Sequence, residues 1–462
     1  MKAIGIRSLL VVAFLLGSVG MTTAYAGGNP FKDATTTASG SSTWDSDMIN
    51  IENITQTGAG VYVAVLDTGL APNWRDYFPK DRVNTALGTG FDQPVAFNVS
   101  REDPCKLGVT VGQLHQTTWV GSTGSTHGTH VVSTIIGYFY QSPNDAVAGY
   151  PLPPIMVRGI APDVTIIPVK VLADYQIPAT PQCPDPQPAS TAVFGTDEMV
   201  AAGINYVTDL AIAGYRPIVI NMSLGGSELA TVEKDAIDRA IANGVIVVAA
   251  AGNAGESGMD YPGAYPPVIS AGSIGWIGEW LHPTNNQPRY RMWWLQYNDP
   301  SMDPGSGDVA DPTSVNDVYV SDFSSRAYAG QQLDVLAPGS WVRGPFPGDP
   351  GFSHLPWWSN GQGGLVGHNP GNFYYVGGTS MATPHVASVA ALMLQKDPTL
   401  TQSQIESYLT SSALTMPSIG SRNIFDNTAP ATITWDTDCN GTPCDPVGAG
   451  VLQADAALAA VP

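Results

Sequence analysis

The chain has 462 residues and a formal net charge of −20, and only 13% of its residues are charged. The excess of acidic over basic residues argues against a nucleic-acid partner. With 50 glycines, 38 prolines and 43% hydrophobic residues, the composition indicates a folded, loop-rich protein rather than a disordered acidic chain.

The first 26 residues have the pattern of a secretory signal peptide. Lys2 and Arg7 precede an apolar stretch that ends in Ala24-Tyr25-Ala26, so we expect cleavage after Ala26 and an exported protein. No later stretch has the roughly eighteen apolar residues of a membrane span, and we therefore expect a protein without one. The remaining chain divides into a short segment, 27–54, interpreted as a remnant propeptide, and one domain over 55–462.

Four cysteines in an exported chain favour two disulfides over a metal site. Cys439 and Cys444 lie close enough in sequence to close a small loop, which would leave Cys105 to pair with Cys183. This is one of three connectivities that the sequence allows.

Short β-branched stretches alternate with stretches of helical periodicity, which predicts parallel βα units. The fold class is therefore α/β, with one doubly wound, mostly parallel sheet and helices on both faces. The predicted strands are 61–66, 164–172, 217–224, 245–251, 268–273 and 333–337, and the predicted helices are 128–139, 196–213, 230–243, 383–396 and 402–412. Between them lie long Gly- and Pro-rich segments, interpreted as surface loop insertions, which carry all four cysteines and Trp293, Trp294, Trp357 and Trp358.

Two candidate catalytic groups follow from this layout. Asp67 ends the first predicted strand, at the edge of the sheet where ligands of open α/β sheets gather; alone, it could equally be a loop cap. His127 and His130 open an apolar helix in "STHGTHVV". Their spacing does not fit a zinc motif, since no HExxH or nearby acidic ligand accompanies them. A histidine base needs a carboxylate to orient it and a nucleophile beside it.

Ser380 supplies the nucleophile in "GGTSMATPHVA". Pro384 just ahead of an apolar stretch predicts a buried helix with the proline in its first turn, which places Ser380 at the helix N-terminus. Unpaired backbone N–H groups gather there and stabilise negative charge. For a lone serine the simpler interpretation is a helix cap.

Together, "VLDTG", "HGTHV" and "GTSMATPHVA", in the order Asp, His, Ser, resemble the three signature motifs of the subtilisin-like serine peptidases (subtilases). "NMSLGG", "AAAGNAG", "YPGAYPPVISAGS" and "GAGVLQADAAL" are similar to further family segments, so the resemblance covers roughly residues 55–458.

The resemblance implies a subtilisin-like fold and a serine endopeptidase of protein or peptide substrates, working through an acyl-enzyme and needing no cofactor for catalysis. Ser380 would be the nucleophile, His127 the general base and Asp67 its orienting carboxylate. Asn253 would donate to the oxyanion. His130 and His385 would be structural, and Ser223, Leu224 and Gly225 would bind substrate. We expect a secreted monomer.

Asp260 stands where the family has the base of the S1 pocket, the site of the residue before the cleaved bond (P1). A carboxylate there would favour Lys or Arg at P1. The alternatives are that Asp260 points to solvent, pairs within the protein or binds calcium. Structural calcium is common in the family, and "DTDCNG" (436–441) has the start of an EF-hand loop, although Val447 stands where the bidentate Glu belongs.

Two other functions remain open on sequence alone. One is a catalytically silent relative that uses its aromatic loops to bind a partner. The other is a processing peptidase whose insertions restrict access to the site. The short N-terminal segment also departs from the family, whose secreted members often carry a longer propeptide that assists folding.

Overall fold

The structure is a computed structural model. It describes residues 12–14, 29–100, 103, 105–121, 126–141, 154–280, 293–295, 314–347, 357–358, 372–426 and 429–462. No helix among these residues is long and apolar enough to cross a membrane.

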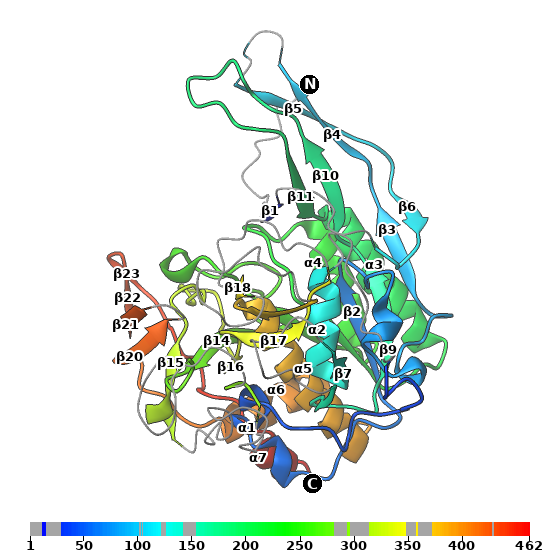
Figure 1. The fold of residues 1–462 in the computed structure, drawn as a ribbon, viewed down its shortest axis with the longest axis vertical. Helices are drawn as coiled ribbons and strands as arrows, with labels where there is room; N and C mark the ends of the chain where they lie inside the picture. Colours follow the sequence, from blue (N-terminus) through cyan, green and yellow to red (C-terminus); the bar gives the residue numbers. More distant parts are fainter. Residues whose placement is uncertain are drawn as a thin grey trace.

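A nine-stranded sheet forms the centre of the described part of the chain (Figure 1). Its strands lie in the order β15-β14-β13-β12-β2-β9-β3-β6, with β16 beside β14, and all neighbours are parallel except β14–β15 and β3–β6. This confirms the predicted α/β class with a mostly parallel sheet. The strands are β2 (Tyr62–Asp67), β3 (Thr89–Asp92), β6 (His115–Thr117), β9 (Thr165–Lys170), β12 (Ile218–Met222), β13 (Ile246–Ala250), β14 (Ile269–Trp276), β15 (Val318–Val320) and β16 (Val335–Pro338).

Each face of the sheet is covered by its own helices because successive side chains of a strand point to opposite faces. On β2, Val63 and Val65 join the apolar cluster under one pair of helices, whereas Ala64 and Leu66 join the cluster under the other pair. The first pair is α2 (Thr126–Ile136) with α5 (Thr379–Lys396), and the second is α3 (Asp197–Ile212) with α4 (Thr231–Ala242).

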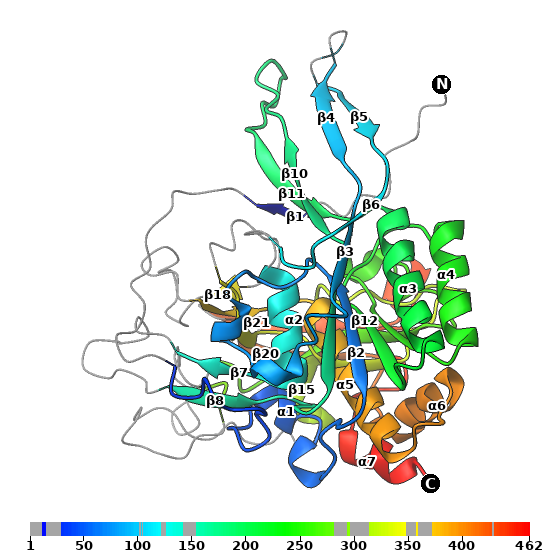
Figure 2. The ribbon, with the colours of Figure 1, turned by 90° about the vertical axis from the view of Figure 1, so that its right-hand side faces the viewer.

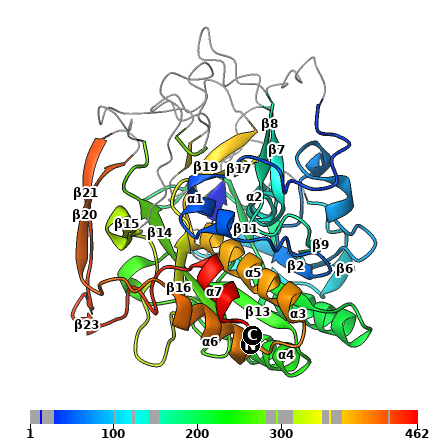
Figure 3. The same cartoon turned by 90° about the horizontal axis from the view of Figure 1, so that it is seen from below.

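Two further helices lie near the C-terminus, where α7 (Ala454–Ala460) packs against α5 and α6 (Gln402–Ser412) packs against α7 (Figure 3). Four helices agree with the predicted bounds to within about three residues at either end. The exception is α5, which begins four residues before the predicted 383.

Several segments interpreted as loops contain paired strands, which corrects that prediction. Strands β4 (Val95–Val99) and β5 (Leu107–Val111) form one hairpin, and β10 (Ala173–Ile177) and β11 (Ser190–Phe194) form another. Both hairpins project from the body as an arm (Figures 1 and 2), and a Cys105–Cys183 disulfide joins them. Strand β1 (Val12–Phe14), inside the predicted signal peptide, pairs antiparallel with β11.

The other interpreted loops also carry strands. They are β8 (Ile155–Arg158), β17 (Val342–Pro345) and β18 (Trp357–Trp358) on either side of β19 (Phe373–Val376), β20 (Gly420–Asp426) with β21 (Ala429–Trp435), and β22 (Asp438–Cys439) with β23 (Thr442–Pro443). Strand β8 pairs with β7 (Gly137–Tyr140), which replaces the last residues of the predicted helix 128–139. Trp293 and Trp294 are wholly buried among other aromatic rings, so their interpretation as surface residues is wrong.

The short N-terminal segment packs into the domain. It contains the one-turn helix α1 (Trp44–Asp47), and Trp44 is completely buried against Trp293. Asp45 pairs with His385 of α5, with 3.1 Å between Oδ2 and Nε2. The N–H of Ala454 donates to the carbonyl of Ile49. From Trp44 onward, this segment is therefore part of the hydrophobic core.

Candidate active site

Asp67 and His127 meet at the carboxyl end of β2. The His127 Nδ1 atom lies 2.8 Å and 3.0 Å from the two carboxylate oxygens of Asp67, which is completely buried. The Thr68 N–H donates to the same carboxylate, and the Thr68 hydroxyl accepts the Gly128 N–H at the start of α2. A Cβ on Gly128 would lie 2.4 Å from the carbonyl oxygen of Gly69, so only glycine lets α2 approach this closely.

The two histidines of α2 have opposite electrostatic surroundings. Burial lowers the pKa of His127, but the adjacent Asp67 charge and its hydrogen bond outweigh burial and raise the pKa above its ordinary value. Burial lowers the pKa of His130 to about 3 and so keeps it neutral, while its Nε2 contacts the Val342 carbonyl oxygen at 3.1 Å. Of the two, only His127 has a carboxylate at Nδ1, the arrangement that a general base needs.

Ser380 is the second residue of α5, and the helix begins earlier than predicted. Pro384 therefore lies in the second turn, where its missing N–H leaves the carbonyl of Ser380 without a helical donor. The Ser223 hydroxyl replaces that donor, at 2.8 Å, and the Ser380 hydroxyl donates to the Ser223 carbonyl at 3.1 Å. Ser223 thus fixes Ser380 from both sides, beside the segment that the sequence assigns to substrate binding.

Asn253 lies against the start of α5. Its Oδ1 accepts from the N–H of Thr379 at 2.8 Å and from the Thr379 hydroxyl at 3.0 Å. These two donors fix the orientation of the amide, because only Oδ1 can accept them. The NH₂ group of Asn253 then has no acceptor among the described residues and can donate to an incoming oxygen.

Asp260 lies between the segments that carry Ser223 and Asn253. A Cβ on Gly225 would lie 2.7 Å from the Cβ of Asp260, and a Cβ on Gly252 would lie 2.5 Å from its Oδ2. Two backbone hydrogen bonds between Gly226 and Tyr261 join the segment of Asp260 to the segment that carries Ser223. The side chain is 8% exposed, burial raises its pKa to about 6, and it has no ion-pair partner among the described residues.

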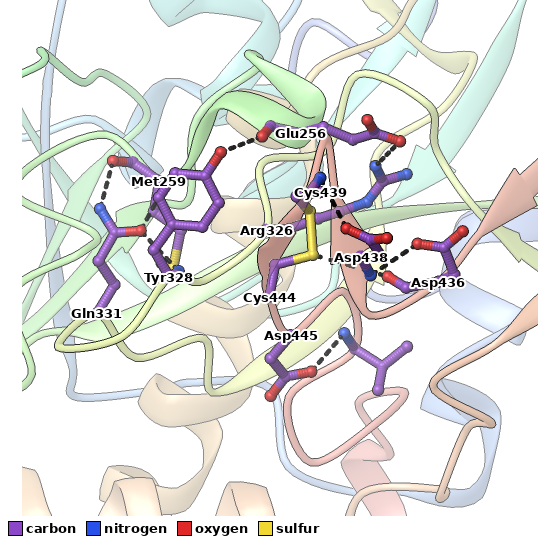
Figure 4. Close-up of a disulfide and its surroundings, with 12 residues drawn as sticks. Glu256, Met259, Arg326, Tyr328, Gln331, Asp436, Asp438, Cys439, Cys444 and Asp445 are labelled. Carbon is purple, nitrogen blue, oxygen red and sulfur yellow. Dashed lines mark hydrogen bonds and ion pairs between the residues drawn. A yellow bond between two sulfur atoms is a disulfide. The ribbon is translucent and has the colours of Figure 1, made fainter.

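The Asp436–Gly441 stretch does not form a calcium cage. Asp436 accepts the Asp438 N–H at 2.8 Å, and Asp438 accepts the Gly441 N–H at 2.7 Å, so both carboxylates cap the turn of a small hairpin. Figure 4 shows this hairpin closed by the Cys439–Cys444 disulfide. The described residues contain no group of three acidic, histidine or cysteine side chains that could hold a metal ion. Structural calcium stays a prediction of the resemblance alone.

Sequence reasoning overlooked two supporting residues, Thr68 and Thr379. Thr68 follows Asp67 in "DTG", and Thr379 precedes Ser380 in "GTS". In both motifs, sequence reasoning considered only the catalytic candidate and not the threonine beside it. A hydroxyl next to a catalytic candidate at a strand or helix end is the signal that could have identified them.

Comparison with known proteins shows similarity to one family over most of the chain. The model of the Subtilase family matches residues 58–434. Subtilisin DY from Bacillus licheniformis is 28% identical over 360 residues, which cover 77% of this chain and 84% of that protein. Subtilisin E from Bacillus subtilis (strain 168) is also 28% identical, and the match covers 77% of this chain but 61% of the relative.

Solved structures show the same fold. The S41 psychrophilic protease superposes with a TM-score of 0.50 at 23% identity, over 90% of this chain and 99% of the other. Fervidolysin from Fervidobacterium pennivorans, described as a keratinolytic enzyme related to subtilisin, superposes with a TM-score of 0.50 at 24% identity, over 91% of this chain and 46% of its own. The family match spans all the site residues described above and shows that the chain belongs to the subtilases, a family of serine endopeptidases.

Proposed function

We propose that this protein hydrolyses peptide bonds through an acyl-enzyme on Ser380, with His127 as the proton-transfer group and Asp67 as its partner. The observation that carries the proposal is the contact between His127 Nδ1 and both oxygens of a completely buried carboxylate. Because Asp67 accepts a hydrogen bond from the Nδ1–H group, the neutral imidazole keeps its proton on Nδ1 and has its lone pair on Nε2, which is the acceptor that a serine nucleophile requires.

In the proposed reaction, Ser380 Oγ turns from the Ser223 carbonyl toward His127 and attacks the substrate carbonyl carbon while Nε2 takes the hydroxyl proton. The negative charge that forms on the substrate oxygen is met by the NH₂ of Asn253 and the N–H of Ser380, at the positive end of the α5 dipole. His127 then gives its proton to the leaving amine as the C–N bond breaks. Water, activated by the same histidine, then hydrolyses the ester bond to Ser380 Oγ, which releases the acyl part of the substrate as a carboxylic acid and restores the serine hydroxyl.

We further propose that Asp260 selects Lys or Arg at P1. Support comes from a buried carboxylate without a cation, held between Gly225 and Gly252 beside the segment of Ser223 and Leu224. A buried charge of this kind is stabilised when an arriving ammonium or guanidinium pairs with it.

The same proposal includes export and action outside the cell as a monomer. The two disulfides support export, because disulfides form and persist in oxidising compartments. The pairing is the one that the sequence favoured.

The test compares the secreted wild type with Ser380→Ala on a diverse peptide mixture, sequencing every cleavage site. We expect cleavage by the wild type and a loss on the order of 10⁶-fold in the variant. Equal melting temperatures serve as the folding control. If both proteins are folded and neither cleaves, the chain is either a silent relative or a zymogen still awaiting processing, and the proposed activity of the secreted protein is wrong. Cleavage of a single sequence would identify a processing enzyme.

A further inference from the structure

Arg326 is a buried cation that the proposed chemistry does not use. It is 3% exposed and lies against the loop 254–259, which follows Asn253. Among the described residues its one ion-pair partner is Glu256, with 3.0 Å between Nη1 and Oε1, and its Nε has no hydrogen-bond partner. The Glu256 side chain is 41% exposed. Burying a guanidinium costs free energy that a single half-solvated partner offsets poorly, so stability does not explain this arginine.

The residue before Arg326 brackets Asn253, the proposed oxyanion donor. The Ser325 N–H donates to the carbonyl of Gly252 at 3.0 Å, and the Ser325 hydroxyl accepts the Ala254 N–H at 3.0 Å. Ser325 therefore contacts the residues on both sides of Asn253. The backbone position of Asn253 follows the position of Ser325, just as its side-chain amide follows the start of α5.

Arg326 extends this attachment by one residue along both segments. Its backbone N–H donates to the carbonyl of Gly255 at 3.2 Å, and its side chain reaches Glu256. Gly255 has a φ of 56°, and a Cβ on it would lie 2.8 Å from the carbonyl oxygen of Asp322, so the loop passes very close to the segment of Arg326. The main chain and the side chain of one arginine thus keep the loop from moving away from Ser325.

The segment of Arg326 is itself fixed by the small disulfide hairpin, as Figure 4 shows. The Ala327 N–H donates to the carbonyl of Asp445 at 2.9 Å, and the Asp445 N–H donates back to the Ala327 carbonyl at 2.8 Å. Asp445 directly follows Cys444, which is bonded to Cys439. Because the hairpin is covalently closed, Arg326 holds the loop against a support with little freedom of its own.

We propose that Arg326 is a positioning residue of the oxyanion site, which holds the Asn253 amide in place through its contacts with Gly255 and Glu256. The inference rests on the proposed peptidase function. A donor stabilises the charge that forms on the substrate oxygen only if it is already in place, without reorganisation during the reaction. Since Arg326 is buried, it acts on kcat through Asn253 rather than on substrate binding.

The experiment is a double-mutant cycle, measured with a fluorogenic peptide built on a sequence that the wild type cleaves. Asn253→Ala should lower kcat by about 10²- to 10³-fold, and Arg326→Met should lower it by about tenfold with KM unchanged, because a misplaced donor loses part of its effect. Adding Arg326→Met to Asn253→Ala should cause no further loss. Arg326→Lys should restore most of kcat, since its ammonium can still pair with Glu256. The melting temperature of Arg326→Met should stay close to that of the wild type, because methionine fills the buried space without a charge.

Arg239→Met is the matched control, because it removes a partly exposed, ion-paired arginine of α4, and it should leave kcat unchanged. If Arg326→Met does not fold, Glu256→Ala breaks the same ion pair from its exposed side and should lower kcat to a similar extent. A wild-type kcat in these variants, or losses that multiply when Arg326→Met is combined with Asn253→Ala, overturns the positioning role but not the peptidase. A wild type that cleaves no peptide and is indistinguishable from Ser380→Ala overturns the proposed function as well.

Discussion

At the scale of single residues, the Ser223 hydroxyl supplies the hydrogen-bond donor that Pro384 lacks. The proline removes the helical donor for the Ser380 carbonyl, and Ser223, the residue directly after β12, supplies one in its place. This exchange ties the nucleophile of the proposed reaction to the substrate-binding segment rather than to its own helix. Any movement of that segment is then transmitted directly to Ser380.

Ser223→Ala should therefore lower the free energy of unfolding by about 1–3 kcal/mol, because a buried carbonyl loses its partner. The loss should be smaller when Pro384→Ala is already present, because the new N–H of residue 384 can donate to Ser380. Urea unfolding of the two single variants and the double variant measures the coupling. Strictly additive losses would show that the two residues act independently.

The pKa of Asp260 predicts a pH-dependent substrate choice. Below its pKa of about 6 the free carboxyl is neutral and cannot attract a cation. The ratio of kcat/KM for Arg-P1 over Phe-P1 peptides should be constant above about pH 7 and fall as the pH drops through 6. Using the ratio cancels the titration of His127, which affects both peptides. Asp260→Asn should give a low ratio that does not change with pH; a wild-type ratio without pH dependence would contradict the assignment.

At the scale of elements, the sequence predicts the parallel strands and the helices that cover them, because their apolar patterns are local. Strand β2 and helix α6 match within one residue. Strands such as β17 and β19 were not predicted, since their pairing partners lie far along the chain and leave no local periodicity. Pro and Gly between the short strands of the arm gave the appearance of loops.

Helix α1 offers a test of the N-terminal segment. Trp44→Ala should lower the free energy of unfolding by about 3–5 kcal/mol, since it empties a site among buried aromatic rings. Chemical denaturation of the secreted protein measures this loss, with the exposed Tyr215→Ala as a control of similar chemistry. A Trp44 variant as stable as the wild type would mean that residues 29–54 behave as a removable propeptide.

At the scale of the whole molecule, the sequence motifs predict which residues form the candidate active site, whereas the hydrogen bonds that position these residues are seen only in the structure. Asp67 and His127 lie together as the motifs imply, although 60 positions separate them. The two hydrogen bonds between Ser223 and Ser380 depend on packing between segments that are distant in the sequence. No spacing in the chain encodes those contacts.

The Cys105–Cys183 bond has a consequence for self-digestion. It closes a covalent ring with a sequence separation of 78, and His127 lies inside the ring while Asp67 and Ser380 lie outside. A peptidase is exposed to cuts by its own kind, above all in projecting hairpins. One cut anywhere between the two cysteines leaves both new ends tethered through the sulfur bridge. Such a nicked molecule should run as a single chain on a gel until it is reduced, with its histidine never released.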